Sequence, residues 1–565
     1  MDDLPDSLDR LTARLETLER RVYVLEHPSG EPISLDAPES ILLPAAPAGE
    51  APSFALAGGA FSVLGKAMLG IAGAYVLRAV AESSSLPKLA LAGLAIAYAI
   101  LWLVWAARVP AGAWVASTIY ACTSALILAP MLWELTLRFK VLSPPAAAGV
   151  LGAFVCAASA LAWQRNLASV FWVANVTAGM VALALSIATH EMAPFIAVVV
   201  LMAVLCEFAA GRNREPSVRP LAAAAADLGV WALIFIYSGP QSTHADYPLL
   251  GTPALLAPGL VLFLVYGASV AFKTALNGQK ISVFETIQTT ITFLLAASSL
   301  LYFVPNGAEN LLGIVCLALS TAGYAAVFTV FDRGQERRNY QVYATWSAAL
   351  FLSGSVMCLP PMGIAVSLSV AAIGATVLGV RLNRTTLKFH GLAYLLAAAA
   401  VSGLLDTTFR AFAGPVQGAP AASVWLISAC AILCYAAGSP CEGESWKEQF
   451  LHLVSASVAI GAAAALLVEG LLGLIALNVH PGPHHLAFIR TLTICLAALA
   501  LTFGGAHWHR KELTRIGYAA LVVVAAKLVF EDLRQGHLEF IAGSIFLFAV
   551  TLIAVPRLSR TGRRV

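Results

Sequence analysis

The feature that most constrains this chain is a long series of apolar stretches separated by short polar breaks. From Ala57 onward the stretches run for about 18 to 24 residues, and each can cross a hydrocarbon layer of about 30 Å as a helix. Composition agrees, since 59% of the residues are hydrophobic and only 12% are charged. The sequence therefore predicts an all-α fold, a polytopic transmembrane helical bundle with about 18 spans. The approximate cores of the spans are residues 59–80, 89–107, 112–132, 146–163, 167–189, 193–210, 221–238, 253–272, 281–304, 311–331, 342–359, 362–380, 387–405, 421–437, 450–477, 485–505, 513–530 and 538–555.

The Lys and Arg residues between the spans predict the orientation of the chain. Short loops that stay in the cytoplasm collect these residues. Connections that follow even-numbered spans carry most of them, for example Arg212, Arg333 and Arg510, whereas few follow odd-numbered spans. Both terminal segments add further arginines. We therefore expect an even number of crossings, with the N-terminus and the C-terminus both in the cytoplasm.

Residues 4–26 have the pattern of a soluble coiled-coil helix. Apolar residues recur with the three-and-four spacing of a heptad seam, which favours parallel self-association; they are Leu8, Leu11, Leu15, Leu18, Val22 and Leu25. The alternative is an amphipathic helix that lies on its own membrane domain. Residues 28–56 are rich in Pro and Ala and read as a disordered tether. The predicted organisation is a cytoplasmic coiled-coil helix (1–27), a tether (28–56) and a multi-pass domain (57–565), whose first span is expected to be an uncleaved anchor.

Several classes of function leave no mark on the sequence. The net charge of +3 is too small to indicate a nucleic-acid partner, and the arginines are dispersed among short loops. The nine cysteines contain no CxxC pair, so neither a disulfide framework nor a cysteine zinc site is expected. The phosphate-loop, dinucleotide-binding, GxSxG and HExxH motifs are missing from the sequence. We therefore expect no cofactor, and catalysis is not assigned.

The most suggestive polar residues lie in the last four predicted spans, near the outer leaflet. Glu469 and Arg490 fall in the outer thirds of neighbouring antiparallel spans, so they are placed to pair. Lys527, Glu531 and Asp532 occupy a similar depth in the final hairpin. A charge inside a membrane helix is costly and usually faces a partner or a wet cavity. Two interpretations stay open: a polar cavity open to the outside, or ion pairs that lock the bundle.

The histidines of the loop before residue 485 raise the question of a metal site. His480, His484 and His485 fall within six residues, and neutral imidazole suits zinc, copper or nickel. No fourth ligand follows from the spacing, so a solvated loop at the membrane boundary is the simpler interpretation.

A second group of carboxylates lies toward the opposite, cytoplasmic side. Glu285 begins a polar stripe on the span at 281–304, and Glu207 and Asp227 lie at similar depth on two earlier spans. If the three converge, they indicate a route for a cation or proton. If they do not, each reaches water at its own helix end.

The first span and the last hairpin carry the most distinctive motifs. The first reads Gly65-Lys66-Ala-Met-Leu-Gly-Ile-Ala-Gly-Ala-Tyr-Val-Leu-Arg78-Ala-Val-Ala-Glu82, and the last runs from Arg515-Ile-Gly517 through Lys527-Leu-Val-Phe-Glu-Asp532-Leu533 to Gly543. Together with the coiled coil, the tether and the many spans, these motifs resemble a large family of predicted bacterial multi-pass membrane proteins classed as a domain of unknown function. The resemblance implies a location in the bacterial inner membrane, and it implies no reaction.

The sequence predicts a polytopic bacterial inner-membrane protein of unassigned activity, with a self-associating scaffold as the first interpretation; its expected partners are the lipid bilayer and a second copy bound through residues 4–26. The first alternative is an ion-driven secondary transporter or a lipid-handling protein that uses the outer charged cavity. The second is a scaffold that recruits a cytosolic partner through the coiled coil, and the third is a metal-dependent intramembrane enzyme.

Overall fold

The computed structural model describes residues 54–83, 87–110, 113–212, 217–240, 245–331, 337–414, 420–438, 446–476, 482–534 and 537–561. The predicted coiled coil at residues 4–26 and the tether up to residue 53 lie outside these ranges. The chain divides into a unit at residues 1–62 and a unit at residues 63–565. Only the second unit, which contains α3 to α20 and most of α2, bears on the candidate site.

The described residues form helices and no strand. The helices are α2 (Phe54–Ser83), α3 (Lys88–Arg108), α4 (Trp114–Trp133), α5 (Pro144–Arg165), α6 (Ala168–Thr189), α7 (Met192–Gly211), α8 (Arg219–Ser238), α9 (Thr252–Ala271), α10 (Val283–Phe303), α11 (Ala308–Ala326), α12 (Arg337–Cys358), α13 (Pro361–Arg381), α14 (Thr385–Val401), α15 (Leu404–Ala413), α16 (Ala422–Ala437), α17 (Trp446–Ala476), α18 (Pro483–His507), α19 (Lys511–Lys527) and α20 (Leu538–Thr561). Each predicted span core coincides with one of these helices, and α15 is additional.

Membrane character is confirmed for most of these helices. Within the described ranges, 13 helices are long and apolar enough to cross a membrane, or up to 14 if α14 and α15 count as one bent span. The apolar parts of α2, α3 and α16 are shorter, at residues 62–76, 92–108 and 422–437. The chain is therefore polytopic, and the count of 18 spans stays a prediction.

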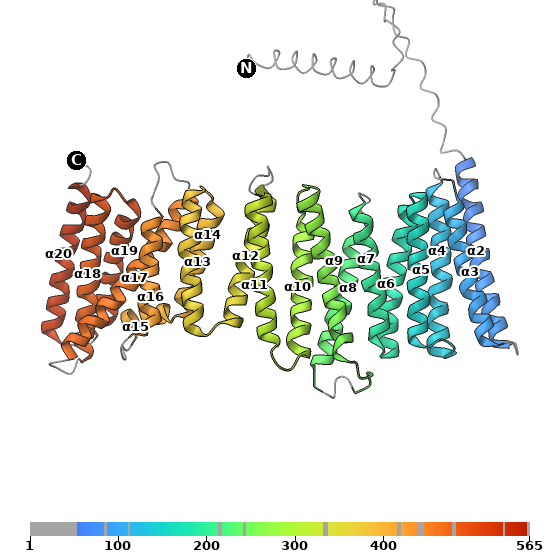
Figure 1. Cartoon of the computed structure of the whole chain (residues 1–565), viewed down its shortest axis with the longest axis horizontal. Helices are drawn as coiled ribbons and strands as arrows, with labels where there is room; N and C mark the ends of the chain where they lie inside the picture. Colours follow the sequence, from blue (N-terminus) through green and yellow to red (C-terminus); the bar gives the residue numbers. More distant parts are fainter. Residues whose placement is uncertain are drawn as a thin grey trace, which may run out of the picture. The chain divides into compact units, whose positions relative to one another are not determined.

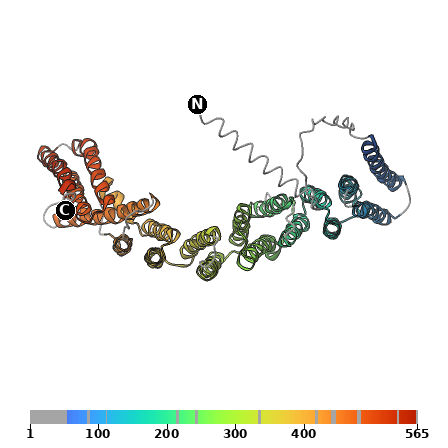
Figure 2. The same ribbon diagram turned by 90° about the horizontal axis from the view of Figure 1, so that it is seen from above.

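Helices that follow one another in sequence pack as hairpins, as in α11–α12, α13–α14 and α18–α19 (Figures 1 and 2). Small residues permit the close approach. A Cβ atom on Gly517 of α19 would lie 2.5 Å from Thr502 Oγ1 of α18, and one on Gly505 would lie 2.4 Å from Thr514 Oγ1. Without a hydrophobic driving force between helices in lipid, such close packing is what holds them together. The α18–α19 hairpin thereby becomes a rigid support for the charged residues that it carries.

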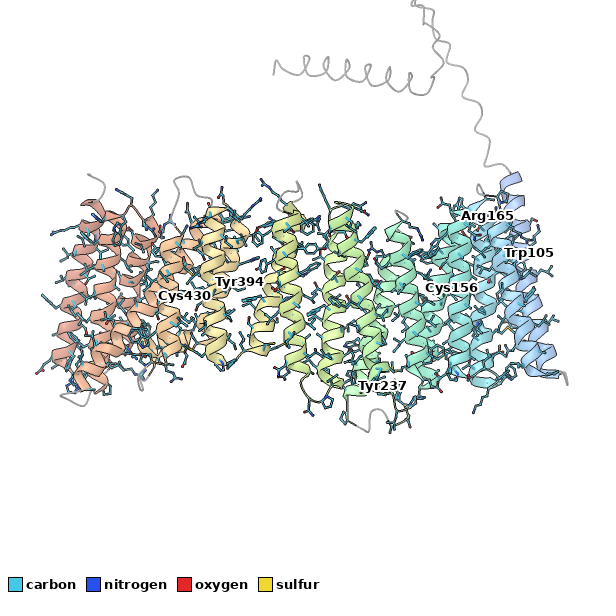
Figure 3. All side chains as sticks on the ribbon, viewed as in Figure 1. Trp105, Cys156, Arg165, Tyr237, Tyr394 and Cys430 are labelled. Atoms are coloured by element: carbon cyan, nitrogen blue, oxygen red, sulfur yellow. The ribbon has the colours of Figure 1, made fainter. Side chains whose placement is uncertain are left out.

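Polar contacts also join helices inside the bundle. On α14, Tyr394 (Figure 3) has its hydroxyl 2.6 Å from the hydroxyl of Tyr324 on α11. Tyr324 Oη also lies 3.2 Å from Nδ1 of His390, one helical turn before Tyr394. A hydroxyl in an apolar interior needs such a partner, because burying it without a hydrogen bond costs free energy.

Within the described ranges, four helices end in a single π-helical turn, namely η1 (Glu134–Arg138), η3 (Phe272–Leu276), η4 (Val327–Phe331) and η5 (Leu528–Asp532). Three of these turns, η1, η3 and η5, contain residues that form ion pairs. In a regular α-helix, residues five apart point roughly 140° away from each other, whereas the wider π turn brings them to one face. Turn η5 thus places Asp532 over Lys527, five residues earlier.

The chain bends by 66° between α14 and α15. Gly403 lies at the bend with φ = 79°, a left-handed conformation that costs glycine little and other residues more. The short helix α15 then packs against α16 and α17 at one end of the bundle (Figure 1). Helix α15 was not predicted from the sequence, because residues 404–413 carry Asp406 and Arg410 and resemble a polar connection.

Candidate functional site

Lys527, at the end of α19, has all of its hydrogen-bonding capacity used inside the protein. Its Nζ donates to Ala487 O at 2.7 Å, to Thr491 Oγ1 at 2.8 Å and to Asp532 Oδ1 at 2.5 Å. An ammonium group has three donors, so none is left over. Glu531 Oε2 lies further away, 3.5 Å from Nζ. The principal partner of Lys527 is therefore Asp532.

Arg490 of α18 holds the carboxyl end of α15. Its Nε donates to Ala411 O at 2.6 Å, and its Nη2 donates to Arg410 O at 2.9 Å and also to Gly414 O. Its Nη1 donates to Glu531 Oε1 at 2.6 Å. The last carbonyls of a helix lack partners within the helix, and a cation there also meets the negative end of the helix dipole. Arg490 thus attaches α15 to the α18–α19 hairpin.

We call Arg490, Lys527, Glu531 and Asp532 the C-terminal charge cluster. Thr491 completes it, because its hydroxyl donates to Asp532 Oδ2 at 2.8 Å. The two cations balance the two carboxylates, and the side chains of Arg490 and Lys527 are only 4% and 7% exposed. Buried charges persist when they are paired and hydrogen-bonded in this way.

A large open cavity lies beside the C-terminal charge cluster. Its volume is about 1320 Å³, and its walls come from α15, α16, α17, α18, α19 and η5. The charged residues in its lining are Glu469, Arg490, Lys527 and Glu531. The other lining residues are apolar or small, and they are Phe412, Ala413, Gly414, Pro420, Trp425, Leu466, Gly470, Leu472, Gly473, Ala476, Gly482, Pro483, Leu486, Val523, Ala526 and Phe530. Asp532 is not among them and faces a much smaller pocket together with His484 and His537.

The cavity follows one face of α17. Its lining runs from Leu466 to Ala476 on that helix, a rise of about 15 Å at 1.5 Å per residue, or half of a hydrocarbon layer of about 30 Å. Gly470 and Gly473 lie on this face, and a Cβ atom on either would have no neighbour within 4 Å. The two glycines therefore leave room along the wall of the cavity.

Glu469 lies in the same wall and is not engaged by Arg490, whose hydrogen bonds go to Glu531 and to carbonyls of residues 410–414. Its Oε2 is buried, and no described residue forms a hydrogen bond with it. Of the charged residues that line the cavity, Glu469 alone forms no ion pair within the described part of the chain. Glu469 and Arg490 line the same cavity, as predicted, but Arg490 forms its ion pair with Glu531 and not with Glu469.

Three histidine rings lie close together where α18 and α20 begin. The ring of His484 lies 4.2 Å from that of His485 and 4.3 Å from that of His537, measured between centroids. His480 lies outside the described residues. Among the residues that the structure describes, no group of three or more His, Cys, Asp or Glu side chains is arranged to hold a metal ion.

The second group of carboxylates, Glu207, Asp227 and Glu285, meets only in part. Arg219, the first residue of α8, pairs with Glu207 at 2.6 Å and lies 3.5 Å from Glu285, which Lys273 contacts at 2.7 Å. We call these four residues the central charge cluster. Ser269 Oγ donates to Glu207 at 2.8 Å. Glu207 and Glu285 therefore converge on Arg219.

Asp227 is held separately from the central charge cluster. The amide nitrogen of Gln288 donates to both of its carboxylate oxygens, at 3.0 and 2.9 Å. Arg219 and Lys273 were missed from the sequence, because they follow or precede polar breaks and read as loop cations. The signal that points to them is their position within one turn of an apolar helix.

A further ion pair, not predicted from the sequence, lies outside the two charge clusters. Arg78 of α2 contacts Glu134 of η1 at 2.8 Å, and both line a smaller cavity of about 240 Å³ between α2, α3 and α4.

Comparison of the chain with models of protein families, with curated proteins and with solved structures finds no match. The family resemblance of the first span and the last hairpin therefore stays a prediction from sequence.

Proposed function

We propose that this polytopic membrane protein binds a membrane amphiphile in the cavity beside the C-terminal charge cluster, as the lipid-handling alternative from the sequence suggests. The observation that carries the proposal is the cavity itself, with a volume of about 1320 Å³, mostly apolar walls and polar groups that include Glu469. Binding sites for small molecules usually combine apolar walls with a few placed polar groups. A cavity about as deep as one leaflet suits an acyl chain.

The distribution of charge supports a lipid-binding protein over an ion-driven transporter. Arg490, Lys527, Glu531 and Asp532 are occupied with one another and with backbone carbonyls. The central charge cluster is likewise made of two cations and two carboxylates in contact. A coupling ion needs groups that are free to bind and release it, whereas these groups hold helices together.

The proposal includes a topology with 18 crossings in the bacterial inner membrane and both termini in the cytoplasm. It is supported by the excess of Lys and Arg in alternate connections. With this topology the cavity opens in the outer leaflet, because α17 and α19 both run from the inner to the outer side. Labelling of single engineered cysteines from outside the cell tests it: a reactive residue at 537 and an unreactive residue at 510 agree with the proposal, and the reverse contradicts it.

Filling the cavity tests the proposed function. Gly470→Leu adds a side chain where a Cβ atom meets open space, so the fold should tolerate it while the cavity shrinks. The matched control is Gly149→Leu, on a helical glycine of α5 that also has no neighbour within 4 Å and does not line the cavity. Lipid that survives extensive detergent washing is counted by mass spectrometry. We expect the wild-type protein and G149L to retain lipid and G470L to lose it; equal retention by all three contradicts the proposal.

Self-association through residues 4–26 is the second candidate, and the heptad seam of these residues favours it. It predicts that deletion of residues 1–27 converts an oligomer to a monomer in detergent, as measured by light scattering. A truncated protein of unchanged mass per particle contradicts it.

A further inference from the structure

The charged groups that line the cavity beside the C-terminal charge cluster differ in how accessible they are to a ligand. The hydrogen-bond donors of its two cations are already used within the protein, so an anionic ligand finds few of them free. Lys527 uses its three donors within the protein, and Arg490 uses Nε, Nη1 and Nη2. To reach either cation, a phosphate or carboxylate would have to displace Glu531, Asp532 or backbone carbonyls.

The carboxylate of Glu469 is in the opposite situation. The residue lines the cavity and is partly exposed there, and among the described residues none forms a hydrogen bond with its buried Oε2. With two cations (Arg490 and Lys527) and three carboxylates (Glu469, Glu531 and Asp532), the sum for these five groups is −1 when all are charged. A carboxylate that sits in a mostly apolar wall and is paired with no cation is unfavourable, and a ligand that supplies a positive hydrogen-bond donor relieves this cost.

We infer that Glu469 selects amphiphiles whose headgroup carries a primary ammonium group. The inference rests on the proposed function of the cavity and adds the chemical class of its ligand. The ammonium donates to the Glu469 carboxylate, while an acyl chain follows the face of α17 that Gly470 and Gly473 leave open. Trp425, which is 55% exposed and lines the cavity, offers an aromatic surface of the kind that attracts cations.

Lipid competition measures this preference. The purified full-length protein is delipidated, incubated in nanodiscs with equal amounts of phosphatidylethanolamine, phosphatidylcholine and phosphatidylglycerol, and its bound lipids are counted by native mass spectrometry. All three lipids carry a phosphate and differ in what is attached to it. Phosphatidylethanolamine has a primary ammonium group, phosphatidylcholine has a quaternary one, and phosphatidylglycerol has none. We expect about tenfold enrichment of phosphatidylethanolamine over phosphatidylglycerol, the size of one charge-assisted hydrogen bond. Phosphatidylcholine, a cation without a donor, should fall between them.

Two variants separate recognition of the headgroup from binding in the cavity. Glu469→Gln keeps the shape of the side chain and should abolish the preference for phosphatidylethanolamine over phosphatidylglycerol. Glu469→Lys should reverse the preference toward phosphatidylglycerol. If lipid is retained without a preference for the ammonium lipid, or if Glu469→Gln keeps that preference, the inference is wrong and the proposed function stands.

Other outcomes would contradict the proposed function or the class of ligand. If the wild-type protein retains no lipid, or if Gly470→Leu retains as much as the wild-type protein, the proposed function itself is wrong. If free ethanolamine at the concentration of the lipid displaces phosphatidylethanolamine, the ligand is a soluble amine, and the assignment to an amphiphile is overturned.

Discussion

Replacement of Arg490 by Met has the largest consequence that the structure predicts for stability. The change removes four hydrogen bonds, to Ala411 O, Arg410 O, Gly414 O and Glu531, and a methionine fills a similar volume. Breaking a buried ion pair by removing one partner costs about 3–5 kcal/mol, because the remaining charge is left without compensation. Glu531 keeps only its 3.5 Å contact with Lys527. We therefore expect R490M to lower the free energy of unfolding by about 3–5 kcal/mol.

Unfolding in mixed detergent micelles measures this loss, and Arg515→Met serves as the control. Arg515 is an exposed arginine on α19, in the same hairpin, so its replacement should change the free energy of unfolding by less than about 0.5 kcal/mol. The double variant Arg490→Met/Glu531→Gln removes both charges, so it should be more stable than the sum of the single losses predicts, by about 1–3 kcal/mol. If R490M lowers the free energy of unfolding by less than about 1 kcal/mol, or if the losses in the double variant are strictly additive, Arg490 does not attach α15 to the α18–α19 hairpin as described.

Three further substitutions test other parts of the fold by thermal unfolding. Gly517→Leu should destabilise the α18–α19 hairpin by 1 kcal/mol or more, since overpacking costs about 1–3 kcal/mol and even a Cβ atom there would lie 2.5 Å from Thr502 Oγ1; an unchanged melting temperature would show that the helices are further apart. Gly403→Ala should cost about 1 kcal/mol, because alanine is strained at φ = 79°, and a stabilised variant would argue against the bend between α14 and α15. Glu207→Gln should cost about 3 kcal/mol by leaving Arg219 without its closest carboxylate, and a neutral result would mean that water reaches the central charge cluster.

The sequence predicts the helices of the fold well, because a membrane helix can be recognised from the length and hydropathy of its apolar stretch. The predicted core at 450–477 falls on α17 (Trp446–Ala476), and the core at 485–505 falls on α18 (Pro483–His507). The short helix α15 was not predicted, because its ten residues mix polar side chains such as Asp406 and Arg410 with apolar ones and are too few to span a membrane alone. Hydropathy detects the helices that face lipid and overlooks one that packs across the end of others.

The candidate site and the pairing of Lys527 with its acidic neighbours were predicted from the sequence, but the expected pairing of Arg490 with Glu469 was wrong. Hydropathy placed Glu469, Arg490 and Lys527 at one depth, and all three line the cavity. The partner of Arg490 is Glu531 and that of Lys527 is Asp532, because η5 widens the last turn of its helix and α15 brings its carbonyl ends to the guanidinium. The spacing of apolar residues predicts neither the π turn η5 nor the bend of 66° between α14 and α15. An ion pair between distant helices is likewise fixed by packing that the sequence does not display.

The most direct test of the account is a density map of the full-length protein in nanodiscs that contain phosphatidylethanolamine. The account predicts an elongated density along the face of α17 at Gly470 and Gly473, with its polar end within hydrogen-bonding distance of Glu469. A cavity that holds only water, or one that is filled by side chains of this protein, would contradict it.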